Sequence, residues 1–371
     1  MSAREINYLY EQSPLDIDYS DQKLIRMNLN ENLVFPESLL RSILAKCTDR
    51  LDPRFYPDEL GTGETDSLCE EIAKYCACSK SSVAIGVGGD QLIDVIFRIK
   101  LGGTSARLFS VDPTFPLYSV FAARQGVRLI LCRINNSTSE RPFSLPKKEL
   151  IEVCKTKKPG LLVLASPNNP TAVQYPEEEI REILDSIPSQ TGLLLDEAYV
   201  EFAEYDGARK FLRSYQNLVI LRTFSKAFAL ASMRLGYILS SDTNFIDQFN
   251  NRFQYPFPVA GLSIKMAIEL LKRKSVVIEY AEKIKTFRQE LIDSLQKFHK
   301  VLRVIPVSNA NFVVVQSRDS RKVAGELLSR YAIAVKYIPV MGKEKEFLRI
   351  TVGSREINQK LLYALRRIVL S

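Results

Sequence analysis

The sequence predicts an α/β protein built on a mostly parallel, seven-stranded sheet, with a smaller α+β domain beside it. From about residue 60 to residue 260, short apolar runs alternate with amphipathic stretches of helical length. Such alternation is typical of a parallel sheet with helices on both faces. Stretches 91–100 and 176–186 are predicted helices, the second because it opens with Pro176 and three glutamates. The predicted strands span 83–87, 107–111, 127–132, 161–165, 192–195, 218–221 and 236–239.

After Pro258 the pattern changes to that of a second, smaller unit. Residues 262–300 have the regular charge spacing of one long or kinked helix. Strands over 311–316 and 347–352 flank a further helix over 321–331. The first 50 residues are too few for a domain and are expected to pack against this unit. We therefore expect an N-terminal arm over 1–27, a small α+β domain from 28–50 and 285–371, and a large domain over 51–284.

Composition restricts the class of protein. The 371 residues carry a net charge of +8, but Lys and Arg are interleaved with Asp and Glu and form no basic tail. A solvated basic surface is therefore favoured over a nucleic-acid site. The N-terminal stretch lacks a signal-peptide pattern, and no apolar run approaches the ~18 residues of a membrane span. We expect a cytoplasmic protein with reduced cysteines and neither a nucleic-acid nor a membrane partner.

The single histidine restricts the chemistry further. His299 lies in a polar, helix-like stretch with no nucleophile motif nearby. A histidine-rich metal centre is excluded, and a Ser-His-Asp triad would have to use this one residue. Proton transfer must then depend on Lys, Tyr, Asp or Glu, and no metal is expected.

Two polar segments follow apolar strands and carry the strongest chemical signal. The run LLL ends in Asp196, with Tyr199 three residues later. Ligands of open α/β sheets bind at the carboxyl ends of strands, although a capping Asp in a turn would look the same. The run LVIL leads to a segment with two hydroxyls, the amine of Lys226 and a guanidinium, Arg234. These groups suit an anionic phosphate, and the lysine suits an aldehyde; the alternative is a lysine in a solvent-facing loop.

Three further segments give weaker evidence for a ligand site when each is considered alone. Asn169 stands before a proline after another strand, where an amide can bind a ligand or simply form a turn. A glycine cluster ending in Gly89 leads into a helix that Asp90 is predicted to cap, and such a helix start can bind an anion. Phe115 can present its ring to a ligand ring or pack in the core.

The five segments together, in this order, resemble fold-type I, class II aminotransferases of the histidinol-phosphate aminotransferase group. The resemblance covers nearly the whole chain. The matching stretches are LNEN (29–32), RFYPDELGT (54–62), GVGGDQ (86–91), DPTFPLY (112–118), SPNNPT (166–171), LLDEAYVEF (194–202), RTFSKAFALASMRLGY (222–237), NANFVVV (309–315) and FLRITVGSREIN (347–358).

The resemblance implies pyridoxal 5'-phosphate as cofactor, bound to Lys226 as a Schiff base. Lys226 would also move the proton between substrate and cofactor. Asp196 would pair with the pyridine nitrogen, and Tyr199 and Asn169 would hydrogen-bond the ring hydroxyl. Phe115 would stack on the ring. The phosphate would be held by Gly89, Asp90, Thr223, Ser225 and Arg234, with Tyr56 supplied by the other subunit of a homodimer.

Substrate recognition is implied less closely. Arg349 would bind a carboxylate, with Lys336 and Asn32 as further substrate-binding residues. The most serious departures from the group's pattern are at two positions near the substrate end. Lys336 stands where the group often has Arg, and the pair Pro14-Leu15 stands where it usually has Pro-Tyr.

The resemblance implies an amino-acid biosynthetic transaminase with glutamate as amino donor and histidinol phosphate, or another acidic compound, as its second substrate. Alternatives within the group are an O-phospho-amino acid, a phosphonate aldehyde or an aromatic amino acid. A decarboxylase resembling threonine-phosphate decarboxylase would share every cofactor residue. A binding or regulatory protein that kept the fold is disfavoured because Lys226, Asp196, Tyr199 and Arg234 are all present.

Overall fold

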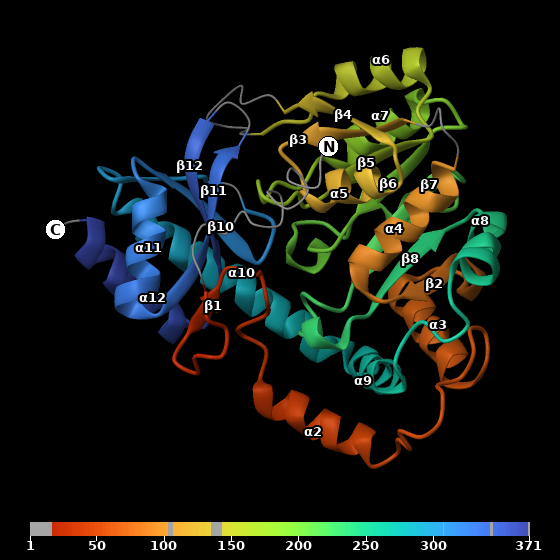
Figure 1. The fold of residues 1–371 in the computed structure, drawn as a ribbon, viewed down its shortest axis with the longest axis horizontal. Coiled ribbons are helices and arrows are strands. Elements are labelled where there is room, and N and C mark those ends of the chain that lie inside the picture. The colour runs from red at the N-terminus through yellow and green to blue at the C-terminus, as the bar shows by residue number, and fades with distance from the viewer. Residues whose placement is uncertain (1–16, 103–106, 135–142, 307, 342–343, 370–371) are drawn as a thin grey trace.

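The chain forms two sheets, each covered by helices (Figure 1). The computed structural model describes residues 17–102, 107–134, 143–306, 308–341 and 344–369. The larger sheet has seven strands in the order β2-β8-β7-β6-β5-β3-β4. Its strands are β2 (Val83–Gly86), β3 (Arg107–Asp112), β4 (Arg128–Arg133), β5 (Leu161–Ala165), β6 (Gly192–Asp196), β7 (Leu218–Thr223) and β8 (Gly236–Ser240).

Every pairing in this sheet is parallel except the two made by β8. The central strands are buried on both faces, as their continuous apolar runs predict. Successive residues point to opposite faces: Val163 belongs to a core with α4, α5 and α8, whereas Leu164 belongs to one with α3, α6, α7 and α9. These helices are α3 (Gly63–Cys76), α4 (Gly88–Lys100), α5 (Leu117–Arg124), α6 (Lys147–Lys157), α7 (Glu177–Ser186), α8 (Thr243–Gln248) and α9 (Gly261–Leu271).

The smaller sheet has five strands in the order β1-β11-β12-β10-β9. It lies beside the long helix α10 and carries α11 and α12 (Figure 1). The strands are β1 (Ile25–Met27), β9 (Leu302–Val304), β10 (Phe312–Ser317), β11 (Ile333–Met341) and β12 (Glu344–Thr351). The helices are α10 (Lys274–Gln296), α11 (Ser320–Tyr331) and α12 (Arg355–Val369).

All seven predicted strands of the larger sheet are confirmed, and so are both strands and the helix predicted for the smaller unit. The single helix predicted over 262–300 is two helices, α9 and α10, because the chain turns at Lys272 and Arg273. Strand β11 was not expected. The N-terminal segment divides: β1 joins the smaller sheet, whereas α2 (Glu37–Thr48) packs against α9.

No helix in the described part of the chain is both long and apolar enough to cross a bilayer. All six cysteines are free thiols, and four of them are buried.

Candidate active site

A cavity of about 470 Å³ opens at the carboxyl ends of β5, β6 and β7 and at the start of α4. The side of the cavity facing the smaller sheet is closed by Arg349 of β12 and by residues 29–31. Most of the predicted site residues meet here, although they come from segments far apart in the sequence. The cavity is lined by Gly89, Asp90, Phe115, Asn169, Asp196, Tyr199, Thr223, Ser225, Lys226, Arg234 and Arg349.

Asp196 ends β6 and is almost fully buried. One carboxylate oxygen accepts a hydrogen bond from the Tyr118 hydroxyl at 2.7 Å, and the other accepts from the Ala198 N–H at 3.1 Å. Burial raises the pKa of Asp196 to about 6, although both hydrogen bonds lower it. The residue is therefore a buried acid with fixed donors, and no cation in the described part of the chain is bound to it.

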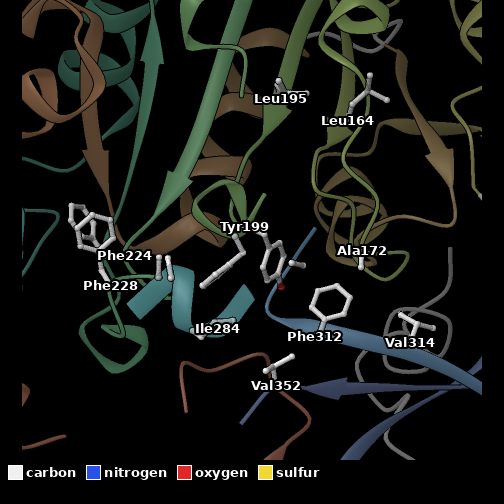
Figure 2. Packing of buried hydrophobic residues seen from close by; sticks show 14 of the residues in the cluster. Leu164, Ala172, Leu195, Tyr199, Phe224, Phe228, Ile284, Phe312, Val314 and Val352 are labelled. Carbon is white, nitrogen blue, oxygen red and sulfur yellow. The ribbon is translucent and has the colours of Figure 1, made fainter. Parts of the chain in front are cut away.

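Lys226 lies in the turn after β7, and its ammonium points toward residues before α2. Its Nζ donates to the backbone oxygens of Leu29 at 3.0 Å and Asn30 at 3.1 Å. Asn30, held in a left-handed conformation (φ 55°), donates from Nδ2 to the Tyr199 hydroxyl at 3.0 Å. The Tyr199 ring meets Phe312 of β10 edge-on, with centroids 5.4 Å apart (Figure 2). Lysine, phenol and amide are thus fixed relative to one another.

The start of α4 and Arg234 form one wall of the cavity. Helix α4 begins at Gly88, whose φ of 72° favours glycine; a Cβ there would lie 2.7 Å from Arg234 Nη2. Arg234 can therefore approach the helix start closely. Its Nη2 also lies 3.3 Å from Asp90 Oδ2. The prediction that Asp90 caps α4 is wrong: it lies in the first turn, and the Val87 N–H donates to Gln91 instead.

Arg349 is half-buried, and two of its three guanidinium nitrogens are fixed. Nη1 donates to Asn169 Oδ1 and Nη2 to the Asn28 carbonyl, each at 2.7 Å, and Nε has no partner among the described residues. Lys336 lies opposite Arg349 in the pairing of β11 with β12. Burial, with a smaller contribution from Arg349, lowers the pKa of Lys336 to about 8.

Some predicted site residues do not reach the cavity wall. Asn32 donates to the Ala227 carbonyl and accepts from two backbone N–H groups, so its contacts fix the chain rather than face the cavity. Tyr56 is 83% exposed and stacks on Phe257 with centroids 4.9 Å apart. Lys336 lies beside Arg349 on the neighbouring strand β11 and is not in the lining. Pro14 and Leu15 lie outside the described residues.

Tyr118, whose hydroxyl donates to Asp196, was not among the residues predicted from the sequence. The residue lies within an apolar helix, where a core aromatic is the ordinary interpretation. A signal was available, because a buried phenol needs a hydrogen-bond partner and a buried carboxylate needs a donor.

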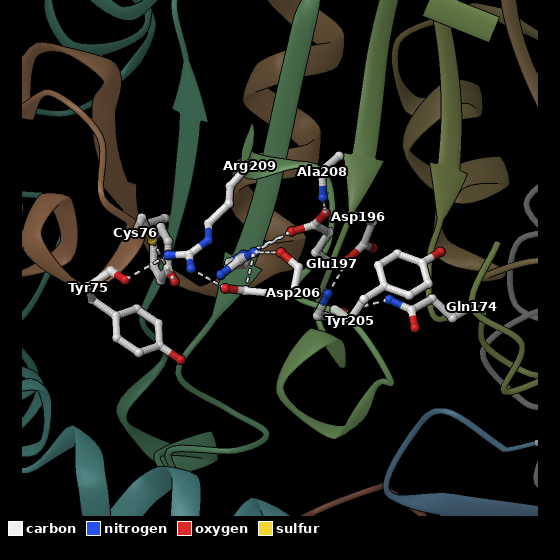
Figure 3. A network of polar contacts seen from close by, with 12 residues as sticks. Tyr75, Cys76, Gln174, Asp196, Glu197, Tyr205, Asp206, Ala208 and Arg209 are labelled. Atoms are coloured by element: carbon white, nitrogen blue, oxygen red, sulfur yellow. Dashed lines mark hydrogen bonds and ion pairs between the residues drawn. The ribbon is translucent and has the colours of Figure 1, made fainter. Parts of the chain in front are cut away.

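A network of charges lies directly behind Asp196 (Figure 3). The guanidinium of Arg222 on β7 binds Glu197 through Nε at 2.9 Å and Nη2 at 2.7 Å, and both side chains are inaccessible to solvent. The other Glu197 oxygen accepts from the Ala208 N–H at 2.6 Å. Because Glu197 follows Asp196, this network fixes the end of β6.

A family model described as "Aminotransferase class I and II" matches residues 23–368. The chain belongs to this family. The aminotransferase is 30% identical over 357 residues to the histidinol-phosphate aminotransferase of Clostridium kluyveri, covering 95% of this chain and 96% of that protein.

Two solved structures show how widely its fold is shared. The histidinol-phosphate aminotransferase of Sinorhizobium meliloti in complex with pyridoxal-5'-phosphate has a TM-score of 0.83 at 24% identity, covering 98% of this chain and 94% of that one. The L-threonine-O-3-phosphate decarboxylase of Porphyromonas gingivalis has a TM-score of 0.77 at 19% identity, covering 94% and 100%. The fold alone therefore does not separate the two reactions.

The enzyme uses pyridoxal 5'-phosphate, and the residues of the cavity fit this cofactor. Asp196 offers a buried carboxylate that binds no cation, which suits a protonated ring nitrogen. The start of α4, two hydroxyls and Arg234 form a donor set for a phosphate. Phe115 supplies an aromatic wall, and Lys226 supplies the amine.

Proposed function

We propose that this aminotransferase moves an amino group between histidinol phosphate, or another small acidic amine that takes the same place, and 2-oxoglutarate, which becomes glutamate when it accepts the group. The observation that carries the proposal is the pair Arg349 and Lys336. They are half-buried neighbours on adjacent strands, and among the described residues no carboxylate pairs with either. Two partly desolvated cations without a counter-ion favour binding of an anion. Arg349 lines the cavity, so its guanidinium can bind a substrate carboxylate there.

The residues around the cavity would hold the cofactor in a fixed pose. Lys226 would bind it covalently through Nζ, and Asp196 would pair with the ring nitrogen. Asn169 and Tyr199 would bind the ring hydroxyl, and Phe115 would cover one face. The phosphate would be bound by Thr223, Ser225, Arg234 and the backbone of Gly89 and Asp90.

When bound, the cofactor supplies a ring that accepts electrons from the reacting substrate carbon. The chain supplies positioning and proton transfer. Once the amino donor has taken its place on the cofactor, the free Lys226 Nζ would accept the proton released by that carbon and later donate it again, as a general acid–base group. The carbonyls of Leu29 and Asn30 show where its ammonium rests. Arg349 holds the substrate carboxylate and so orients the carbon next to Lys226.

We also propose that the enzyme works as a homodimer, with Tyr56 completing the phosphate site of the partner. In the single chain, Tyr56 and Phe257 stack in an exposed position beside Phe55 and Tyr255, which are each 72% exposed. An aromatic patch of this kind is typical of an interface. Sedimentation of the holoenzyme tests the assembly, and a monomer with full activity would contradict it.

The substrate proposal is tested by measuring the two half-reactions separately. Wild-type enzyme should convert the cofactor to its amino form with glutamate, and histidinol phosphate should do the same. Lys336→Ala should raise the KM for histidinol phosphate far more than that for glutamate, because only the former carries a phosphate. Lys322→Ala, which removes an exposed lysine of α11, is the matched control.

Three outcomes would overturn this assignment. A wild type inert toward histidinol phosphate, or Lys336→Ala kinetics equal to those of Lys322→Ala, would leave only the general aminotransferase activity. Release of carbon dioxide from an O-phospho-amino acid, with no requirement for a 2-oxo acid, would indicate the decarboxylase instead.

A further inference from the structure

The two oxygens of Asp196 are occupied by two different elements. The Ala198 N–H comes from the same loop, two residues on, whereas the Tyr118 hydroxyl comes from α5 on one face of the sheet. Each oxygen therefore holds one fixed donor. The carboxylate cannot rotate without breaking one of these bonds, and its remaining lone pairs are left for the cavity.

Tyr118 itself is fully buried and held at both ends. Its exposed fraction is 0%, and its hydroxyl bonds Asp196 at 2.7 Å. Its ring meets the Phe115 ring edge-on, with centroids 5.6 Å apart and planes at 86°. Phe115 in turn lines the cavity. One side chain thus contacts both the acid and the aromatic wall of the cofactor site.

We propose that Tyr118 is a positioning residue that keeps Asp196 ionised and aimed at the cofactor ring while supporting Phe115 against its face. The inference rests on the proposed pairing of Asp196 with the ring nitrogen. It adds a residue that touches neither substrate nor cofactor and acts through two that do. A phenol hydrogen bond to a carboxylate favours the charged form, and an ionised Asp196 is the form that can pair with a protonated ring.

The groups around Asp196 make this donor important. Burial, Asp90 of α4 and the adjacent Glu197 all raise the pKa of Asp196. The Tyr118 hydroxyl and the Ala198 N–H lower it, the hydroxyl more strongly. Burial and the neighbouring carboxylate raise the pKa of Tyr118 well above its usual value, so the phenol stays protonated and donates. Without it, Asp196 would bind a proton at a higher pH.

The test compares Tyr118→Phe with Tyr175→Phe in the full-length chain. Tyr175 is also fully buried, but its hydroxyl has no partner among the described residues, so its removal breaks no hydrogen bond. The pKa of Asp196 is followed by carboxyl ¹³C NMR before cofactor is added. In Tyr118→Phe it should rise by about one unit or more, the effect expected from a lost hydrogen bond to a charged group. In Tyr175→Phe it should not move.

In the holoenzyme, Tyr118→Phe should shift the acidic limb of kcat/KM to higher pH and lower kcat more than it changes KM. The absorbance of the bound cofactor should change its pH dependence in parallel. A merely structural role would lower yield or stability without moving these midpoints. If Tyr118→Phe does not fold, the wild type still decides the matter. The ¹³Cζ resonance of Tyr118 should then titrate with the same midpoint as Asp196.

The inference would be overturned if the pKa of Asp196 were unchanged in Tyr118→Phe. It would also be overturned if the ¹³Cζ chemical shift of Tyr118 did not change as Asp196 titrates. Failure of the underlying assignment looks different. Asp196→Asn would then turn over at a near-normal rate, whatever the NMR titration shows. If Asp196 is the ring partner, Asp196→Asn should keep its cofactor. Its activation free energy for proton abstraction should rise by several kcal/mol, and each ~1.4 kcal/mol slows the rate tenfold.

Discussion

Arg349 Nη1 and Asn169 Oδ1 lie 2.7 Å apart, although the first residue lies in the smaller sheet and the second in a loop of the larger one. Asn169 follows β5 of the larger sheet, and Arg349 lies in β12 of the smaller one. The amide proposed to bind the cofactor therefore also fixes the guanidinium proposed to bind the substrate. A group held in place before the substrate arrives loses less entropy on binding.

Replacing Asn169 with alanine should consequently damage both half-reactions. It removes a hydrogen bond to a charged group, which is typically worth about 1.5–3 kcal/mol. We expect kcat/KM for glutamate and for the second substrate to fall together by ~10–100-fold, as measured in single turnovers. A loss confined to cofactor affinity, with kcat/KM intact at saturating cofactor, would show that Arg349 does not depend on this amide.

Lys226 should prove to be the residue that carries the cofactor. Borohydride reduces a C=N bond between an amine and an aldehyde, so reduction followed by peptide mass analysis should place the cofactor mass on Lys226. Lys226→Ala should lose at least the ~10²–10⁴-fold typical of a general acid–base group. The added mass on any other lysine would contradict the assignment.

The buried pair of Arg222 and Glu197 predicts a large loss of stability when one partner is removed. Arg222→Met leaves the Glu197 carboxylate buried without its cation, which costs about 3–5 kcal/mol in comparable cases. Denaturant unfolding of the holoenzyme measures the loss. Arg355→Ala breaks the exposed ion pair with Glu290 and should leave the unfolding midpoint nearly unchanged. Equal effects of the two substitutions would mean that the buried network does not stabilise the end of β6.

The larger sheet could be predicted almost completely because parallel strands buried on both faces are continuous apolar runs. Strand β11 was not predicted because Lys336 and Pro339 interrupt its apolar pattern. Strand β1 was not predicted because it spans only three residues. The position of the break between α9 and α10 could not be predicted because Lys272 and Arg273 continue the charge pattern of a helix.

The residues of the site likewise fall into those that the sequence predicts and those that it does not. Lys226, Asp196 and Tyr199 follow strands directly, so the strand pattern alone places them at one edge of the sheet. Tyr118 and Asn30 reach the site only through tertiary packing, from an apolar helix and from the segment after β1. Their local sequence is that of ordinary core and turn residues, and the one signal is that a buried phenol such as that of Tyr118 needs a hydrogen-bond partner.

A last prediction concerns Glu201, on the short 3₁₀ helix η2 (Val200–Phe202) just after Tyr199. Glu201 lines a second cavity of about 410 Å³ together with Tyr75 and Arg222. No side chain among the described residues pairs with its carboxylate. Burial raises its pKa from 4.5 to about 7, because the nearby Arg222 offsets only part of the desolvation.

This raised pKa fixes the sign of a pH effect on stability. Between pH 4.5 and about 7 the folded chain binds more protons at Glu201 than the unfolded chain does, so the unfolding free energy falls as the pH rises through this window. Glu201→Gln removes that loss and should stabilise the enzyme at pH 8 by on the order of 1–3 kcal/mol, with little gain at pH 5. Thermal unfolding at the two pH values measures the difference. Glu152→Gln, on the exposed side of α6, is the control and should change the stability against thermal unfolding equally at pH 5 and pH 8. A Glu201→Gln enzyme that gains as much at pH 5 as at pH 8 would show that the buried carboxylate is not the titrating group.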